Sequence, residues 1–567
     1  MNIFYCFGKK LQHLCNTSCQ KLTYLIKSIF FLAACFCRFI LLRANPLWIQ
    51  IVYFISISIL GFGFLKVIKP LNQTKPKNLD LFFTSISATT VSSMSTVEME
   101  TFSNPQLIII TILMFIGSEI FTSMVGLHFI RSRLKTDLDK IASSHARLAS
   151  LNPFIVDQIH LELEMVTNEV HNKSHESLHS ISHESSHNKS HESLHNKSHQ
   201  SLHNISHESL STTNENLRYL SMKYLGYVVL GYIVILHITG VFGVTLYLEM
   251  IPSAKQVLKN KGLNITTFSI FTIVSTFANC GFVPTNENMV VFRQNSGLLL
   301  MLIPQVLLGN TLYPACLRFC IWVLGKFYKK KECNYLLKHT EEVGYKHLLK
   351  GKHSVFLVAT VFGLIVVQVT LFCVMDWDSE GLKGLNNYEK LIGVLFQSVN
   401  SRHTGESIVD ISILSQAMLV LFVLMMYLPP YTSFLPIKDD MKNSKSNKRM
   451  KKRRGKVTEN LILSQLSYLV IFIILVCITE RKKLKEDPLN FNVLNIVVEV
   501  ISAYGSVGFS TGYSCERQLH PEANCENKWF GFVGKWSDEG KIILILVMLY
   551  GRLKKFNMDG GKPWKLL

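Results

Sequence analysis

Long apolar runs alternate with short ones along this chain, and each short run ends in a polar turn rich in serine, threonine or glycine. A membrane-crossing helix needs about 20 residues, and seven runs are long enough: roughly 46–68, 106–130, 223–250, 297–325, 354–375, 412–436 and 459–480. An eighth candidate, 541–550, is short and runs into Arg552, Lys554 and Lys555. Between them stand four runs of ten to fourteen residues, at 81–90, 265–278, 388–399 and 491–504.

The short runs suit re-entrant segments better than crossings. Irregular backbone at membrane depth is tolerated only where protein or water satisfies its polar groups, so four such segments indicate one wet pathway that all of them line. The pattern therefore predicts an all-α polytopic membrane protein of four membrane–pore loop–membrane units. These units would supply eight spans and four re-entrant pore helices around one central pore. The alternative is that the short runs are helices of extracellular loops, but the polar turn after each one disfavours it.

Composition agrees with a membrane protein. Of 567 residues, 48% are hydrophobic and 17% charged, whereas a soluble protein carries about 25% charged residues. The net charge of +20 is concentrated in 327–352 and 438–456. Both stretches fall on the same side after an even number of crossings, and the positive-inside rule makes that side the cytosol. We interpret them as topology determinants and lipid-headgroup contacts, and expect no nucleic-acid partner.

The predicted organisation follows from these runs. The N-terminal segment 1–45 has no clean signal peptide, because its apolar stretch is broken by Lys27 and Arg38; we expect a cytosolic or interfacial lead-in, or alternatively an extra membrane segment. The remaining boundaries are 46–135 for the first unit, 136–217 for a cytosolic loop, 218–328 for the second unit, 329–353 for a basic loop, 354–436 for the third unit, 437–457 for another basic loop, and 458–567 for the fourth unit and tail.

A histidine stands at every fourth position from His171 to His207, ten in all. Histidines at i and i+4 share a helix face and can bind zinc or copper. The alternative, which we favour, is a polar low-complexity expansion with too little apolar surface to fold. Two pairs of loop residues point to covalent modification: Cys515 and Cys525 as a disulfide, and Asn72 and Asn264 as glycosylation acceptors, all on the outer side.

Several motifs resemble the HKT family, the plant sodium and potassium transporters of the Trk/Ktr/HKT superfamily. The resemblance covers about residues 46–567 apart from the histidine tract, and rests on 117–124, 309–314, 399–406, 504–515 and 549–556. It implies four membrane–pore–membrane units around one pore, with both termini in the cytosol. The selectivity filter would consist of Ser95, Gly281, Gly405 and Gly508, whose carbonyls would bind Na+. The neighbouring filter residues would be Val91, Ser92, Ser93, Met94, Asn279, Cys280, His403, Thr404, Ser506 and Val507.

In that family, serine at the first filter position goes with sodium-selective transport and glycine there with potassium permeability. Carbonyl rings replace the hydration water of a cation, and glycine lets the backbone turn its carbonyls inward. One serine in the ring breaks its symmetry, which should penalise potassium more than the smaller sodium ion.

Charged residues at membrane depth are the next candidates, because they are costly and usually functional. We expect Glu98 and Glu406 to draw cations to the pore mouth, unless they form a solvated rim. Arg402 and Glu119 are expected in structural pairs or hydrogen bonds. Arg552, Lys554 and Lys555 either form an electrostatic barrier below the filter or mark a cytosolic helix end. A proline pair must break the third unit's last helix, and a gate is expected there, at Leu428, Pro429, Pro430 and Tyr431.

The sequence thus predicts passive, sodium-selective transport across the plasma membrane, without cofactor or covalent catalysis. No Walker-type phosphate loop or nucleophile arrangement indicates an enzyme. The alternatives are Na+/K+ symport or K+ permeation, and, more remotely, a divalent-metal transporter that uses the histidine tract. The expected partners are Na+ or K+, the lipid bilayer and, by the resemblance, a second copy of the chain.

Overall fold

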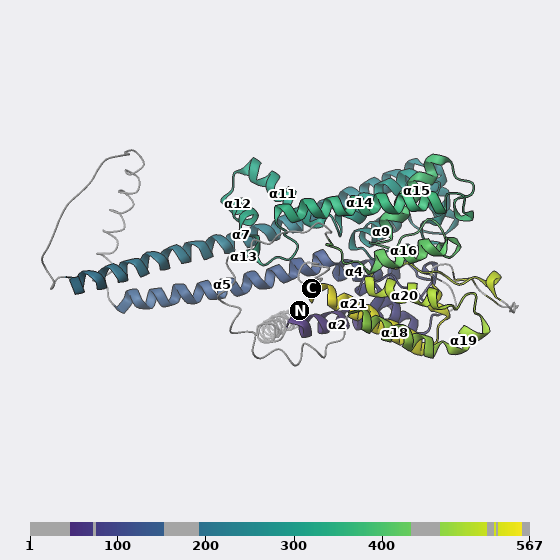
Figure 1. The fold of residues 1–567 in the computed structure, drawn as a ribbon, viewed down its shortest axis with the longest axis horizontal. Coiled ribbons are helices and arrows are strands. Elements are labelled where there is room, and N and C mark those ends of the chain that lie inside the picture. Colours follow the sequence, from purple (N-terminus) through teal and green to yellow (C-terminus); the bar gives the residue numbers. More distant parts are fainter. Residues whose placement is uncertain are drawn as a thin grey trace, which may run out of the picture.

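The computed structural model describes residues 46–71, 75–151, 192–432, 465–518, 525, 527–528 and 531–557. Within these ranges every regular element is a helix, apart from one isolated antiparallel bridge between Tyr513 and Lys528. Figure 1 shows the helices running mostly along one direction, as expected for a bundle that crosses a bilayer.

The helices form four similar units. The first contains α2 (Pro46–Val67), α3 (Asn78–Thr89), α4 (Asn104–Gly117) and α5 (Glu119–Leu151). The second contains α7 (Glu192–Met250), α8 (Pro252–Asn260), α9 (Ile265–Ala278), α10 (Ser296–Leu308) and α11 (Tyr313–Tyr328). The short helices α12 (Lys331–Lys338) and α13 (Thr340–Val343) lead to the third unit, which contains α14 (Gly351–Met375), α15 (Asn387–Asn400) and α16 (Gln416–Tyr427). The fourth contains α18 (Gln465–Thr479), α19 (Arg481–Glu486), α20 (Val493–Gly505) and α21 (Asp538–Asn557).

The four short helices α3, α9, α15 and α20 are the expected pore helices. Polar caps start three of them: Asn264 accepts the Thr266 amide at 2.9 Å, Asn386 forms a capping box with Glu389, and Asn492 accepts the Asn495 amide at 2.7 Å. These helices are buried on nearly all sides. That explains why the parts of these helices next to the filter segments have no charged, solvent-facing side.

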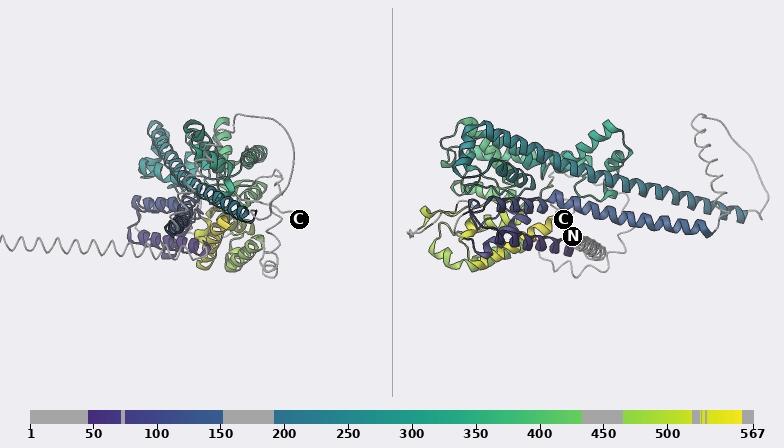
Figure 2. Two further views of the ribbon diagram at one scale, coloured as in Figure 1. Left: turned by 90° about the vertical axis from the view of Figure 1, so that its left-hand side faces the viewer. Right: turned by 180° about the vertical axis from the view of Figure 1, so that it is seen from behind.

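The units close into a ring. The second helix of each unit packs on the pore helix of the next, so that α4 contacts α9, α10 contacts α15, α16 contacts α20, and α21 returns to α3. The last contact includes an ion pair between Lys541 and Asp80, 2.8 Å apart and almost completely buried. Seen along the long axis, the purple, teal, green and yellow units follow one another around a common centre (Figure 2).

Two predicted continuous spans are broken instead. The run 106–130 divides into α4 and α5 with a 52° bend, and the run 297–325 divides into α10 and α11 with an 81° bend. A glycine allows each break to pack tightly, because a Cβ on Gly117 would overlap the Thr89 carbonyl oxygen and one on Gly309 that of Phe277. Both carbonyls lie at the ends of the short helices α3 and α9, so the second helices bend where these short helices end.

Among the described residues, α2, α7 and α14 each contain a stretch long and apolar enough to cross a membrane, and the two bent pairs qualify as further spans. The helices α5 and α7 run side by side and project well beyond the rest of the bundle (Figure 1). The first part of the histidine tract and Asn72 lie outside the described residues, and α7 contains its last part.

Candidate pore and filter

The segments that follow three of the pore helices have the same backbone geometry. After α3, α9 and α20, the first left-handed residue is Val91, Asn279 and Ser506, with φ of 50°, 57° and 52°. Two residues later the backbone is left-handed again, at Ser93, Gly281 and Gly508, with φ of 54°, 92° and 98°. In each case the intervening amide donates to the carbonyl of a serine five residues earlier, at 2.9–3.0 Å.

Ser93, and not Ser95, is therefore the first-unit residue equivalent to Gly281 and Gly508. The sequence-based assignment of Ser95 to the filter position is corrected, because Ser95 has no left-handed backbone and lies two residues beyond the equivalent point. The Ser95 hydroxyl instead donates to the Val97 carbonyl at 2.5 Å. A left-handed backbone is unusual for a residue with a Cβ, so Ser93 occupies a position where glycine would be less strained.

The four segments that follow α3, α9, α15 and α20, which we call the filter strands, meet in a closed ring. A Cβ on Gly281 would overlap the Thr404 carbonyl oxygen, one on Gly405 the Val507 carbonyl oxygen, and one on Gly508 the Ser93 side chain. The Ser93 Oγ would lie only 3.4 Å from a Cβ on Gly281. The Ser93 hydroxymethyl group thus lies between the second and fourth strands, where the other units have no side chain.

The pore helices also direct charge toward this ring. The chain enters the ring directly from the C-terminal ends of α3, α9, α15 and α20. The C-terminus of a helix carries about half a negative charge. Four converging C-termini therefore favour a cation at the centre of the ring without a carboxylate in it.

The third strand is held differently. Gly405 has φ of 67° and donates its amide to the Asn400 carbonyl at 3.1 Å, while the Thr404 hydroxyl donates to the Asn400 side chain. Both ring nitrogens of His403 are engaged, Nδ1 2.6 Å from the Val399 carbonyl and Nε2 2.8 Å from the Thr311 hydroxyl. His403 thereby links the third strand to the break between α10 and α11.

Polar side chains behind the ring, which the sequence analysis missed, fix the strands. Ser275 Oγ and Ser502 Oγ accept the amides of Gly281 and Gly508 at 3.1 and 3.0 Å. Gln397 and Glu499, on α15 and α20, each accept two hydrogen bonds from the strand beyond the filter glycine. Aligning Gly281 with Gly508 brings Ser275 and Ser502 to the same position, and this spacing is the sequence signal that could have found these two side chains.

The outer side of the ring opens into a small cavity. Its lining includes Ser93, Ser95, Glu98, Gly281 and Gly508. Glu98 is thus near the entrance as expected, although the Lys528 ammonium lies 4.0 Å from its carboxylate and offsets part of its charge.

Glu406 does not lie at the mouth, contrary to expectation. Its side chain is completely buried, and its carboxylate accepts the Thr276 hydroxyl at 2.5 Å. Because Thr276 belongs to α9, Glu406 joins the third strand to the second pore helix. It has no access to water from which it could attract cations.

The intramembrane arginines are buried as well. Arg552 is 1% exposed, donates to the Gly117 carbonyl at the α4 break, and lies over the Phe54 ring at 5.6 Å. Arg402 is 7% exposed and donates to the carbonyls that follow α16. Neither forms part of the mouth. Lys554 and Lys555 lie in the last turns of α21, and their side chains are outside the described part of the structure.

The helix α16 ends at Tyr427, as its proline pair requires. Leu428 has extended backbone, and the described chain continues through Pro429, Pro430 and Tyr431 to Thr432. The Tyr431 hydroxyl is 2.7 Å from His347 Nδ1. The predicted break is therefore present.

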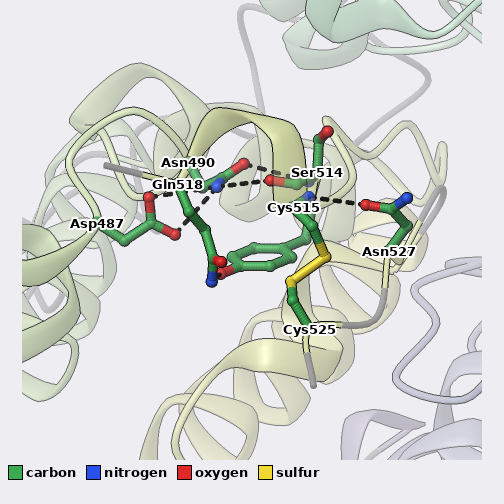
Figure 3. Close-up of a disulfide and its surroundings, with 8 residues drawn as sticks. Asp487, Asn490, Ser514, Cys515, Gln518, Cys525 and Asn527 are labelled. Atoms are coloured by element: carbon green, nitrogen blue, oxygen red, sulfur yellow. Dashed lines mark hydrogen bonds between the residues drawn. A yellow bond between two sulfur atoms is a disulfide. The ribbon is translucent and has the colours of Figure 1, made fainter. Parts of the chain in front are cut away.

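The outer loop of the fourth unit contains the disulfide between Cys515 and Cys525 (Figure 3). The loop is anchored on α20's leading segment, because Asn490 exchanges hydrogen bonds with the Ser514 backbone at 3.0 and 3.2 Å (Figure 3). The Cys515 amide donates to Asn527 at 2.7 Å. Asn264 is exposed at the start of α9. In the described part of the chain, no three His, Cys, Asp or Glu side chains gather as metal ligands.

The chain is similar to known cation transport proteins. Residues 199–557 match the family described as "TrkH: Cation transport protein". The chain is 45% identical to the cation transporter HKT1;3 of Oryza sativa subsp. japonica over 526 residues, covering 92% of each chain. It is 46% identical to the sodium transporter HKT1 of Arabidopsis thaliana, covering 88% of this chain and 91% of that one. The crystal structure of the potassium transporter TrkH from Vibrio parahaemolyticus aligns with 90% of this chain and 83% of its own, at 12% identity and a TM-score of 0.45.

Proposed function

Because the chain belongs to the HKT branch of the TrkH family of cation transport proteins, we propose that it moves Na+ passively and selectively through the ring formed by Ser93, Gly281, Gly405 and Gly508. Like its relatives, it is a membrane cation transporter and not an enzyme. The observation that carries sodium selectivity is the position of the Ser93 side chain between the second and fourth strands.

The chemistry needs only the backbone and one side chain. Carbonyl oxygens of the four strands replace hydration water as the ion enters, and the helix C-termini stabilise its charge. The Ser93 hydroxymethyl group removes the fourfold symmetry of the ring and narrows it next to Gly508. A potassium ion needs a wide ring of evenly placed oxygens. The asymmetry therefore weakens the binding of potassium more than the binding of sodium.

Two serine variants separate the two assignments of the filter position. In oocytes under two-electrode voltage clamp, the wild type should shift its reversal potential by about 59 mV per tenfold change in external Na+ and ignore K+. Ser93→Gly should gain K+ sensitivity. Ser95→Gly is the matched control, one hydroxymethyl group removed two residues away, and should keep the wild-type selectivity.

Other outcomes would replace the proposal. If Ser95→Gly changes selectivity and Ser93→Gly does not, the filter serine is Ser95. If the wild type already follows K+, the protein is a Na+/K+ symporter or a K+-permeable transporter, which is the second candidate function. If deletion of residues 171–208 abolishes zinc transport while no Na+ current exists, the remote divalent-metal alternative applies.

The location, orientation, oligomeric state and glycosylation of the protein form part of the same proposal. The plasma membrane is the proposed location, as the resemblance to the plant HKT family implies. The basic stretches support cytosolic termini, because the positive-inside rule places these stretches in the cytosol. The protein forms a homodimer in which each protomer has its own pore. Asn264 carries a glycan. Epitope tags at either end, stained with and without permeabilisation, test the orientation.

A further inference from the structure

The outer loop of the fourth unit contacts the first filter strand. We call its residues 513–535 the outer segment, of which the structure describes 513–518, 525, 527–528 and 531–535. A Cβ on Gly534 would overlap the Thr96 carbonyl oxygen, at 2.8 Å. The Phe532 amide donates to the Ser510 hydroxyl of the fourth strand at 3.2 Å. The outer segment therefore packs against two of the four strands, at residues that follow the ring.

Lys528 has a well-fixed backbone position within the outer segment. Its amide donates to the Tyr513 carbonyl at 2.9 Å, and its carbonyl accepts the Tyr513 amide at 2.7 Å. Close to this bridge, the disulfide between Cys515 and Cys525 joins the two arms of the segment covalently. The Cys515 amide also donates to the Asn527 side chain at 2.7 Å. The point from which the Lys528 side chain starts is thus held from both arms.

The Lys528 side chain reaches the carboxylate at the outer cavity. Its ammonium lies 4.0 Å from the Glu98 carboxylate, and the two side chains are 23% and 19% exposed. Glu98 lines the cavity together with the ring residues Ser93, Gly281 and Gly508. An ammonium and a cation that share one carboxylate are closer than the Debye length, about 8 Å at physiological ionic strength, so salt screens their repulsion only in part.

We propose that Lys528 sets the apparent affinity of the pore for external Na+, because its tethered ammonium competes with Na+ for the Glu98 carboxylate. The proposal rests on the function proposed above, since it takes the ring and the cavity as the ion pathway. The ammonium neutralises Glu98 while no ion is present and repels an approaching Na+. The pore therefore saturates at a higher external Na+ concentration than the carboxylate alone would give.

A purely stabilising role explains this ion pair less well. The disulfide and the bridge between Tyr513 and Lys528 already order the backbone of the outer segment. An ion pair that is partly exposed and 4.0 Å long adds little to the stability of a protein. What the pair does change is the electrostatic potential beside the ring, where the potential governs how readily a cation approaches.

The test measures the external Na+ concentration that gives half-maximal inward current in oocytes, with N-methyl-D-glucamine replacing Na+ at fixed ionic strength. This concentration does not depend on the number of molecules at the surface. Lys528→Met keeps the length of the side chain without its charge. It should lower the half-saturating concentration about fivefold, the effect of one unit charge about 4 Å away in water. Lys528→Arg should stay near the wild type, and Lys528→Glu should lower the value further.

A double-mutant cycle and a matched control identify the cause of the shift. Glu98→Gln alone should raise the half-saturating concentration. In that background Lys528→Met should lose most of its effect, because no carboxylate is left to compete for. Lys535→Met is the matched control: Lys535 belongs to the same outer segment, but its ammonium lies over the Tyr513 ring at 5.0 Å, and its loss should leave the value unchanged. If Lys528→Met does not reach the surface, Lys528→Gln, which stays polar, decides.

An unchanged half-saturating concentration overturns the proposal, as does an equal shift in Lys535→Met or an undiminished effect in the Glu98→Gln background. Failure of the proposed function looks different, because the parent chain then carries no Na+ current. Chemical labelling still reports on Lys528 in that case. The thiolate that reacts in Glu98→Cys carries the charge of the carboxylate, and its labelling by cationic and anionic methanethiosulfonate reagents can be followed by a maleimide–polyethylene glycol gel shift. Adding Lys528→Met should raise the ratio of the cationic to the anionic rate, and an unchanged ratio overturns the proposal.

Discussion

Gln397 and Glu499 hold two different filter strands in the same way. The Gln397 Oε1 accepts the Ser407 hydroxyl and the Ile408 amide, both at 3.1 Å. The Glu499 Oε1 accepts the Ser510 hydroxyl at 2.6 Å and the Thr511 amide at 3.0 Å. The donors are in both cases the second and third residues after the filter glycine, and the second polar atom of each side chain is buried without a partner. An amide and a carboxyl group therefore serve as equivalent acceptors behind the ring.

This equivalence predicts that Glu499→Gln is tolerated and Glu499→Ala is not. Glutamine keeps the accepting oxygen, whereas alanine leaves the Ser510 hydroxyl and the Thr511 amide unpaired, at about 1–3 kcal/mol each. Heat inactivation in detergent and Na+/K+ reversal potentials measure the two effects. Gln397→Glu, the reciprocal change, should also be tolerated. Equal damage from Glu499→Gln and Glu499→Ala would show that the charge, not the acceptor, matters.

Glycines that pack against the ends of pore helices should resist substitution by alanine. A Cβ on Gly117, Gly309 or Gly551 would overlap a carbonyl oxygen at the end of a pore helix. Because backbone cannot move aside as a side chain can, each alanine should destabilise the protein by about 1–3 kcal/mol. The measurement is the midpoint of heat inactivation of detergent-solubilised protein.

Gly363 on α14 is the matched control, since nothing lies within 4 Å of a Cβ built there. Gly363→Ala should leave the midpoint unchanged or raise it slightly, because alanine is the better helix former. A midpoint for Gly117→Ala equal to that of Gly363→Ala would contradict the close packing of α4 against α3.

The ion pairs of Lys261 with Glu100 and Glu287, which we call the outer clamp, should stabilise the first two units. Its ammonium lies 2.6 Å from the carboxylates of both Glu100 and Glu287, and Glu100 exchanges hydrogen bonds with Asn286 at 3.0 Å. Lys261→Met leaves the two acids facing each other, and should lower the heat-inactivation midpoint by the equivalent of about 1 kcal/mol without changing ion selectivity. An unchanged midpoint would mean that water and salt already screen the clamp.

The stabilisation by the ion pairs of Lys261 should not change in mildly alkaline solution. Partial burial lowers the pKa of Lys261, but the hydrogen bonds and charges of Glu100 and Glu287 outweigh it, so the pKa is raised. A raised folded-state pKa gives a stabilisation that is complete below the unfolded value, about 10.4 for lysine, and is lost only above it. Between pH 7 and 9 the difference in midpoint between wild type and Lys261→Met should therefore stay constant.

The disulfide should stabilise its loop and leave the filter intact. Cys515 and Cys525 are separated by 10 residues, and closing a loop of that size is worth about 3 kcal/mol. The double change of Cys515 and Cys525 to serine should make the loop sensitive to limited proteolysis while Na+ selectivity persists. Cys477→Ser, a change at a free cysteine, is the control. A cleavage pattern identical to wild type would mean that the Asn490 contacts alone order the loop.

The apolar pattern was enough to predict the four pore helices, and α9 begins and ends where predicted, at Ile265 and Ala278. The length of each apolar run and the polar residues at its ends reflect burial, and burial determines where these helices begin and end. The position of the filter serine was beyond this reasoning, because Ser93 and Ser95 have the same side chain. Only backbone conformation separates them. The spacing of Ser87, Ser275 and Ser502 from their strands is the sequence signal that would have set the register.

Helix breaks and buried acids were harder to predict for another reason. Gly117 and Gly309 stand in apolar runs that read as continuous, and their bends follow from contacts with pore helices distant in sequence. Glu406 was assigned to the mouth from its place beside a filter glycine. Its burial depends on Thr276 from another unit, a tertiary partner that no local pattern specifies.

The ion pair between Asp80 and Lys541 joins residues 461 positions apart. A ribosome that has inserted the first pore helix must add almost the whole remaining chain before the partner of Asp80 exists. Until then the first unit has a carboxylate without its partner and a flank that the fourth unit has not yet covered, and such exposed surface makes an intermediate prone to aggregate. Biogenesis of this protein thus has a late checkpoint: a nascent chain shortened before α21 is left with an open pore wall, however well its first three units have folded.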